Sequence, residues 1–229
     1  MNQLNNNKLK VISFDMEGTL ATPDFSNAVW HRGIPSLYAM VHGMEFDEAR
    51  KIVIAKYDEI GDQRPEWYDI KYWFSRFGLG DHKALMESCR STISYYTEAK
   101  EAFRYFARRY EVVIVSSSTR EFLPYLMDGL IQLSGLSNSG ESSFRVFSSI
   151  SDYGLLKTPP FYLKVCQELG IQPEEMVHVG DSLVFDYLNA GAAGIRAFYL
   201  DRLQSNGHPQ ALKSLLELKN NLSKSVNIK

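Results

Sequence analysis

The chain has 229 residues, 45% of them hydrophobic and 13% aromatic, which is enough for one large domain or for a core with an insertion. Its formal net charge of -2 excludes a global basic field that would recruit nucleic acid or an anionic membrane surface. Residues 1–10 lack the apolar stretch of a signal peptide, and no apolar run is long enough to predict a transmembrane helix. We therefore expect a soluble, cytoplasmic protein that binds neither nucleic acid nor membrane.

The first predicted element is a buried strand over residues 10–14, where Val11, Ile12 and Phe14 form a nearly continuous apolar run. No strand pattern follows it for many residues. Instead, breaks rich in glycine or proline separate helical patterns at residues 26–41, 47–60, 67–77 and 85–96. The sequence therefore predicts an all-helical insertion over residues 21–98, placed directly after the first strand.

Helical and strand patterns alternate in the remainder of the chain. Strands are predicted at residues 112–115, 144–147, 176–179 and 197–200, and helices at residues 98–110, 120–131, 160–169, 185–190 and 212–222. This alternation is typical of an α/β fold with a parallel sheet flanked by helices. We expect residues 1–20 and 99–229 to form this core together.

The three strongest strand patterns each lead into side chains that can carry chemistry. The first leads into Asp15 and Glu17, the second ends at Ser116, and the third leads into Asp181. Ligands of open α/β sheets bind outside the carboxyl ends of the strands, so these side chains are expected to converge. Carboxylate oxygens are suited to Mg²⁺, so the sequence predicts a local metal and anion site.

In their order along the chain, these residues resemble the four motifs of haloacid dehalogenase (HAD) superfamily hydrolases. The segment Asp15–Thr19 resembles the first motif, D-x-D-G-T, with glutamate at the third position. Ser116 matches the second motif, Lys157 before two prolines matches the third, and Gly180–Asp186 matches the fourth, G-D-x-x-x-x-D. The resemblance covers nearly the whole chain outside the insertion. It implies a Rossmann-like core, with the insertion acting as an α-helical cap over the site.

The resemblance also implies a role for each residue in phosphoryl transfer. Asp15 would be the nucleophile that forms an aspartyl-phosphate, and Ser116, Ser117 and Lys157 would bind the phosphate. Magnesium would be held by Asp15, by the backbone carbonyl of Glu17 and by Asp181, with Asp186 in support..

Glu17 indicates the reaction class. In phosphatases of the family, the second carboxylate protonates the leaving-group oxygen and then activates the hydrolytic water. Dehalogenating members generally lack a carboxylate there, and P-type ATPases carry threonine. Glutamate keeps the carboxylate on a side chain longer by about 1.5 Å, one C–C bond. The D-x-E-G-T form also resembles the enolase-phosphatase branch, which is a likeness in one residue.

We therefore expect a Mg²⁺-dependent phosphatase that hydrolyses a small phosphorylated metabolite. Two alternatives stay open at this point: a phosphomutase on the same core, and a HAD-derived binding or regulatory protein without turnover. The cap offers cationic candidates for contact with an anionic leaving group, namely Arg32, Lys56, Arg64 and Lys71. The sequence does not choose among them, and it gives neither the substrate nor the oligomeric state.

Overall fold

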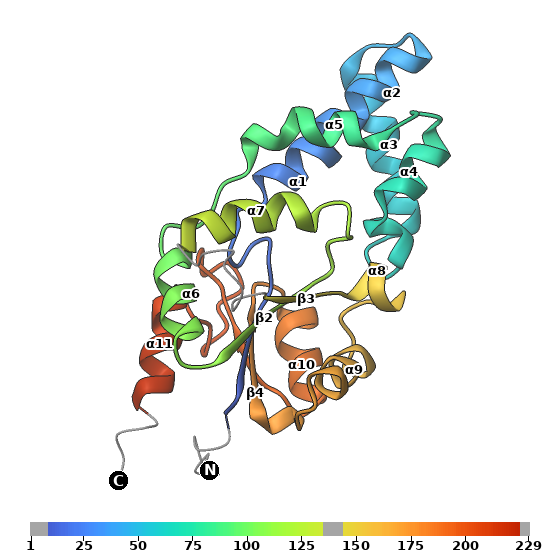
Figure 1. Ribbon diagram of the computed structural model, residues 1–229. Coiled ribbons are helices and arrows are strands. Elements are labelled where there is room, and N and C mark those ends of the chain that lie inside the picture. Colours follow the sequence, from blue (N-terminus) through green and yellow to red (C-terminus); the bar gives the residue numbers. More distant parts are fainter. Residues whose placement is uncertain (1–8, 135–143, 225–229) are drawn as a thin grey trace.

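The computed structural model describes residues 9–134 and 144–224, and its centre is a parallel five-stranded sheet (Figure 1). The strand order is β3-β2-β1-β4-β5, and Phe14 of the central strand lies opposite Ile114 and Val179. The strands are β1 Val11–Phe14, β2 Glu111–Ser116, β3 Arg145–Ser148, β4 Met176–Gly180 and β5 Arg196–Tyr199. The α/β fold and the parallel sheet predicted from the sequence are confirmed.

Helices cover both faces of this sheet, because successive side chains of a strand point to opposite sides. Ile12 and Ile114 belong to one buried cluster, and Val11 and Val113 belong to the other. The first cluster is covered by α6 Ala99–Ala107, α7 Leu123–Ser134 and α11 Leu215–Lys224. The second is covered by α9 Pro159–Leu169 and α10 Asn189–Ala192, with the short α8 Ser149–Tyr153 following β3. The two groups of helices lie on opposite sides of the strands in Figure 1.

A separate set of helices, distinct from those that cover the two faces of the sheet, follows β1 in the chain and lies beyond α7 in Figure 1. Its α-helices are α1 Asp24–Ala28, α2 Ile34–His42, α3 Phe46–Ile60, α4 Ile70–Phe77 and α5 His82–Cys89. The π-helical segment η2 Val29–Gly33 joins α1 to α2, and the 3₁₀ turn η3 Pro65–Tyr68 lies between α3 and α4. A second 3₁₀ turn, η4 Arg90–Thr92, follows α5. The fully buried Trp73 meets Tyr57 edge to face, with ring centroids 4.6 Å apart, which ties α4 to α3.

Three predicted helices differ from the observed ones by more than small shifts at their ends. The helix expected over residues 67–77 is divided, because Asp69 is extended between η3 and α4. The helix expected over residues 85–96 ends by Thr92, because the chain then runs extended beside the segment that leaves β1. Tyr95 pairs with Ala21 there, and the Tyr96 amide donates to the Leu20 carbonyl at 3.1 Å. The helix expected over residues 185–190 is instead a π-helical segment, η6 Leu183–Leu188, which continues into α10. No helix of the described residues is both long and apolar enough to span a membrane.

Candidate active site

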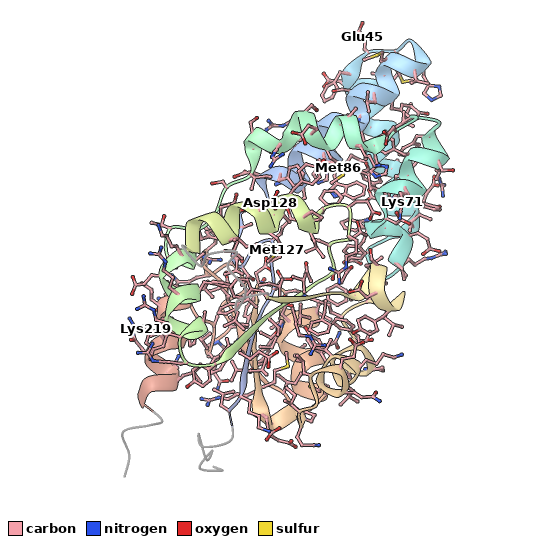
Figure 2. The ribbon with its side chains drawn as sticks, in the orientation of Figure 1. Glu45, Lys71, Met86, Met127, Asp128 and Lys219 are labelled. Carbon is pink, nitrogen blue, oxygen red and sulfur yellow. The ribbon has the colours of Figure 1, made fainter. Side chains whose placement is uncertain are left out.

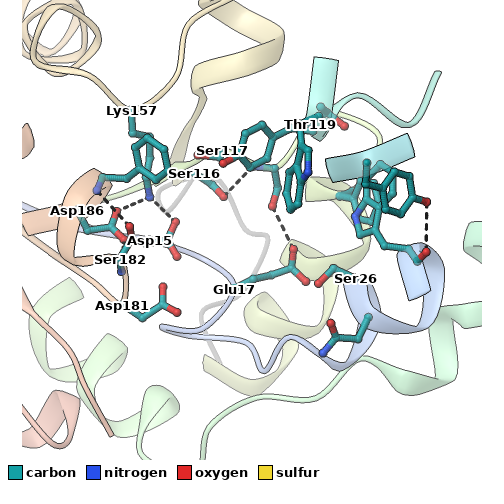
Figure 3. Close-up of a pocket in the computed structure, with 18 of the residues that line it drawn as sticks. Asp15, Glu17, Ser26, Ser116, Ser117, Thr119, Lys157, Asp181, Ser182 and Asp186 are labelled. Carbon is teal, nitrogen blue, oxygen red and sulfur yellow. Dashed lines mark hydrogen bonds and ion pairs between the residues drawn. The ribbon is translucent and has the colours of Figure 1, made fainter. Parts of the chain in front are cut away.

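The carboxyl ends of three adjacent strands meet the helices α1 and η3 around a cavity of about 280 Å³ (Figure 3). Asp15 follows β1, Ser116 ends β2 and Asp181 follows β4. The Asp15 amide donates to the Val179 carbonyl at 3.0 Å, which fixes this residue between β1 and β4. All seven site residues predicted from the sequence line this cavity: Asp15, Glu17, Ser116, Ser117, Lys157, Asp181 and Asp186.

A buried lysine lies between two buried carboxylates in the floor of the cavity. The Lys157 ammonium donates to Asp15 Oδ1 at 2.6 Å and also forms an ion pair with Asp186. Burial, only partly offset by Lys157, raises the pKa of Asp15 well above its ordinary value, and the charges of Asp186 and Asp181 add to the effect. Burial alone would also raise the pKa of Asp186, but Lys157 and His178 hold it below its ordinary value. The lysine therefore orients both carboxylates.

A polar network below the floor fixes Asp186. His178 Nε2 lies 3.0 Å from Asp186 Oδ1, and His178 Nδ1 lies 2.9 Å from the Ser13 hydroxyl. The Ser182 amide donates to Asp186 Oδ2 at 2.9 Å, and the Tyr162 hydroxyl donates to the Phe185 carbonyl at 2.9 Å. Sequence motifs did not point to His178 or Tyr162 as supports of the site, because both stand within ordinary apolar patterns.

The three aspartates offer a donor set that suits a hard cation. One carboxylate oxygen from each of Asp15, Asp181 and Asp186 lies within 4.8 Å of the others. Burial, together with the neighbouring Asp186, raises the pKa of Asp181 to about 6. Three carboxylates face one ammonium here, so a divalent cation would offset the excess negative charge. The residues present therefore fit Mg²⁺, which prefers carboxylate oxygens.

At Gly18 the backbone leaves no room for a side chain beside the Asp181 carboxylate. Its φ is +81°, and a Cβ there would lie 2.0 Å from Asp181 Oδ2. Gly18→Ala is expected to displace the Asp181 carboxylate and to weaken the apparent Mg²⁺ affinity by about 10- to 100-fold. Titration of activity with Mg²⁺ measures this effect.

Gly43→Ala is the matched control for this substitution, because Gly43 has a φ of +64° and open space around it. That variant should lose about 1 kcal/mol of stability from backbone strain but keep its Mg²⁺ dependence. If Gly18→Ala needs the same Mg²⁺ concentration as the wild type, the absence of a side chain at Gly18 does not determine the position of the Asp181 carboxylate.

The loop after β2 presents hydrogen-bond donors to the cavity. The Ser118 amide donates to Ser116 Oγ at 3.1 Å, so the Ser116 hydroxyl keeps its own proton to donate. The Ser148 hydroxyl donates to the Ser118 carbonyl at 2.8 Å and holds the loop against the end of β3. Ser117 lies between these two anchored positions and also faces the cavity (Figure 3). The loop can thus bind an anion.

Glu17 lies beside the three aspartates, on the side of α1, as Figure 3 shows. The Ser118 hydroxyl donates to its Oε2 at 3.1 Å. Burial raises the pKa of Glu17, against the opposing hydrogen bonds of Ser26 and Ser118. A carboxyl group with a raised pKa is suited to donating a proton. Glu17 is bound by a serine hydroxyl, whereas Asp15 is bound by the Lys157 ammonium.

Arg202, which follows β5, is a further contributor to the site. Its guanidinium donates to the carbonyls of Gly18 at 2.6 Å and Thr19 at 2.8 Å, and it pairs with Glu98 at 2.9 Å. It also stacks on the Tyr96 ring, 3.4 Å from the centroid. Arg202 therefore fixes the turn after Asp15 against the segment that returns from α5. No sequence signal singled it out, since an isolated arginine after a strand is common.

The four cationic side chains that were candidates for contact with a leaving group do not line this cavity. Three of them form ion pairs with glutamates elsewhere. These pairs are Lys56 with Glu59 at 2.6 Å, Arg64 with Glu66 at 2.6 Å, and Lys71 with Glu121 at 2.8 Å. Lys71, on α4, is labelled in Figure 2. The wall opposite the carboxylates consists mainly of aromatic side chains.

Comparison with solved structures places this architecture among HAD proteins. A HAD phosphatase from Thermococcus onnurineus is 24% identical, with a TM-score of 0.77, over 93% of this chain and 98% of that one. A predicted phosphoglycolate phosphatase from Haemophilus somnus is 17% identical, with a TM-score of 0.63, over 96% and 99%. A 2-haloacid dehalogenase from Pseudomonas syringae is 16% identical, with a TM-score of 0.63, over 94% and 99%.

At these identities, the structural neighbours show a shared fold, and they are named for different activities. None of the curated proteins compared with the chain is a significant match. The family model described as haloacid dehalogenase-like hydrolase matches residues 9–194, which include every residue of the site described above except Arg202. The chain therefore belongs to the haloacid dehalogenase-like hydrolase family.

Proposed function

We propose that this hydrolase is a Mg²⁺-dependent phosphatase that acts on a small phosphate monoester through an aspartyl-phosphate on Asp15. The observation that carries the proposal is the presence of two carboxylates with different environments. Asp15 is bound by the Lys157 ammonium beside the other aspartates, whereas Glu17 accepts a hydrogen bond from the Ser118 hydroxyl on the side of α1 (Figure 3). Such a separation of roles is what a nucleophile and a general acid require.

In the first step, a carboxylate oxygen of Asp15 attacks phosphorus as the bond to the ester oxygen breaks. Lys157 holds Asp15 in place, and Ser116 with the Ser117 amide donates to the phosphoryl oxygens. Glu17 gives its proton to the departing alkoxide oxygen. The alcohol then leaves, and the phosphoryl group remains on Asp15.

In the second step, the Glu17 carboxylate accepts a proton from water as the water oxygen attacks the phosphorus. The bond between phosphorus and Asp15 breaks, so that Asp15 and inorganic phosphate are released and Glu17 is again protonated. Bound Mg²⁺, held by Asp15, Asp181 and the Glu17 carbonyl with Asp186 in support, would supply charge neutralisation between the nucleophile and the phosphate dianion.

In the proposed arrangement, residues 1–20 and 99–229 form the catalytic core, and residues 21–98 form a cap. Side chains of α1, η2, α3 and η3 line the cavity together with the strand-end residues. A helical cap in this position would exclude water and contact the leaving group.

Removal of the metal tests the proposal. With p-nitrophenyl phosphate or acetyl phosphate, EDTA is expected to lower the rate of phosphate release by at least about 100-fold, and excess Mg²⁺ should restore it. Asp181→Asn should need a higher Mg²⁺ concentration for half-maximal activity than the wild type. Full activity in EDTA would contradict the proposed chemistry.

Three further measurements separate the alternatives: isomerisation of a phosphorylated sugar, binding of beryllofluoride, and release of halide. A phosphomutase would isomerise a phosphorylated sugar without net release of phosphate. A protein without turnover would release no phosphate from either substrate and would not bind beryllofluoride with Mg²⁺. A dehalogenase would release halide from a 2-haloacid, a reaction for which Glu17 has no evident use.

A further inference from the structure

The cavity wall that faces the carboxylates is built from aromatic rings. Trp30, Tyr57, Trp67 and Tyr68 come from the helical segment after β1, and Phe122 comes from the turn before α7. A leaving group attached to a phosphate at Asp15 would have to lie within this space. The side chains of the wall therefore determine which alcohol the site accepts.

These rings are held in place by contacts with one another. Trp30 stacks on Phe122 with ring centroids 5.6 Å apart and planes 13° apart, and the Tyr57 ring meets Trp30 edge to face. The Tyr57 hydroxyl donates to the Trp30 carbonyl at 3.2 Å. Trp67 meets Tyr68 edge to face at 4.9 Å, and its carbonyl accepts from the buried Trp73 indole at 3.1 Å. The wall is thus preorganised, which lowers the entropy lost when a ring binds.

The wall offers no positive charge to an anionic leaving group. Among the described residues that line the cavity, the cationic side chain is Lys157, which is already bound to Asp15 and Asp186. His31 also lines the cavity, but burial lowers its pKa, so it is neutral at pH 7. A carboxylate on the leaving group would instead lie in a cavity that holds Glu17 and Asp181.

The size of the cavity is compatible with a leaving group of one ring. A dry protein cavity of about 150 Å³ holds a benzene molecule. The volume here, about 280 Å³, is sufficient for a phosphoryl group and one planar ring. It lies just below the usual range for small-molecule sites, roughly 300–1,000 Å³.

We infer that the natural substrate is a phosphate monoester whose alcohol is uncharged and carries a single aromatic or heteroaromatic ring. The inference rests on the proposed phosphatase function and adds the substrate class. The ring lies against the Trp30, Trp67 and Phe122 side chains, and the ester oxygen points toward Glu17.

Four phosphates of matched reactivity test this inference by kcat/KM with Mg²⁺. The ratio of benzyl phosphate to methyl phosphate measures the contribution of the ring, because both leave as simple alcohols. The ratio of 4-carbamoylbenzyl phosphate to 4-carboxybenzyl phosphate measures the effect of charge at nearly constant shape. We expect each ratio to be at least about 10, since aromatic contacts and desolvated charges both contribute at that scale.

Trp67→Leu should reduce the benzyl-to-methyl ratio about tenfold, and an unchanged far-ultraviolet circular dichroism spectrum would show that the variant is folded. Phe46→Leu is the matched control, because Phe46 is 39% exposed on α3 and does not line the cavity. The inference is overturned if the wild type hydrolyses acetyl phosphate but both substrate ratios are near 1. It is also overturned if the benzyl-to-methyl ratio of Trp67→Leu equals that of the wild type. A wild type that hydrolyses no acetyl phosphate with Mg²⁺ would overturn the proposed function itself.

Discussion

Asp15→Asn is expected to abolish phosphate release, with a loss on the order of 10⁴-fold or more in kcat, because the amide cannot form the aspartyl-phosphate. The fold should survive this change. Asparagine has nearly the same shape, and Lys157 keeps its ion pair with Asp186. The cluster also carries more negative than positive charge, so the loss of one carboxylate relieves repulsion. Phosphate release from acetyl phosphate, together with thermal unfolding, measures both effects.

Asp24→Asn provides the control for this prediction, since Asp24 is an exposed carboxylate at the start of α1 that does not line the cavity. Its activity should equal that of the wild type. An intact mass is needed for Asp15→Asn, because deamidation would regenerate the aspartate. Activity above a tenth of the wild-type value in a sample with the correct mass would contradict the assignment of Asp15 as nucleophile.

The strands β1, β2 and β4 were predictable from the sequence because they are buried on both faces and are therefore short, nearly continuous apolar runs, such as Val112 to Val115. The edge strands β3 and β5 are less buried, and their sequence patterns are weaker. The chemistry-bearing residues were predictable for a related reason. The carboxyl ends of parallel strands meet at one edge, so Asp15 and Asp181, far apart in sequence, lie together.

Other features depend on tertiary contacts that leave no local pattern. Residues 93–96 were expected to continue a helix, yet they run extended because Tyr95 pairs with Ala21 at the base of the helical segment. The support of Asp186 by His178 joins two elements through a hydrogen bond that no spacing indicates. The sequence left open whether cationic side chains such as Lys56 and Arg64 reach the site, and in the structure both pair with nearby glutamates on the surface.

Glu17→Gln is expected to lower kcat by about 10²- to 10⁴-fold, which is the usual contribution of a general acid and base. Glutamine has the same length, and its carbonyl can still accept the Ser118 hydroxyl, so the position of the side chain should hold. The apparent Mg²⁺ affinity should stay within about twofold, because the proposed contact of this residue with the metal is its backbone carbonyl. Steady-state kinetics at several Mg²⁺ concentrations separates these two quantities.

Two substrates whose leaving groups differ in their need for a proton provide the most specific test of this prediction. A p-nitrophenolate leaves without protonation, so Glu17→Gln should still form the aspartyl-phosphate from p-nitrophenyl phosphate and then hydrolyse it slowly. The expected result is a burst of p-nitrophenol with accumulation of phosphorylated protein, whereas benzyl phosphate, which needs a proton on its leaving oxygen, should show no burst. Glu17→Asp keeps a carboxylate on a side chain about 1.5 Å shorter and should recover part of the activity. Equal losses for both substrates, without a burst, would mean that Glu17 acts on Asp15 or on the metal rather than on the leaving group.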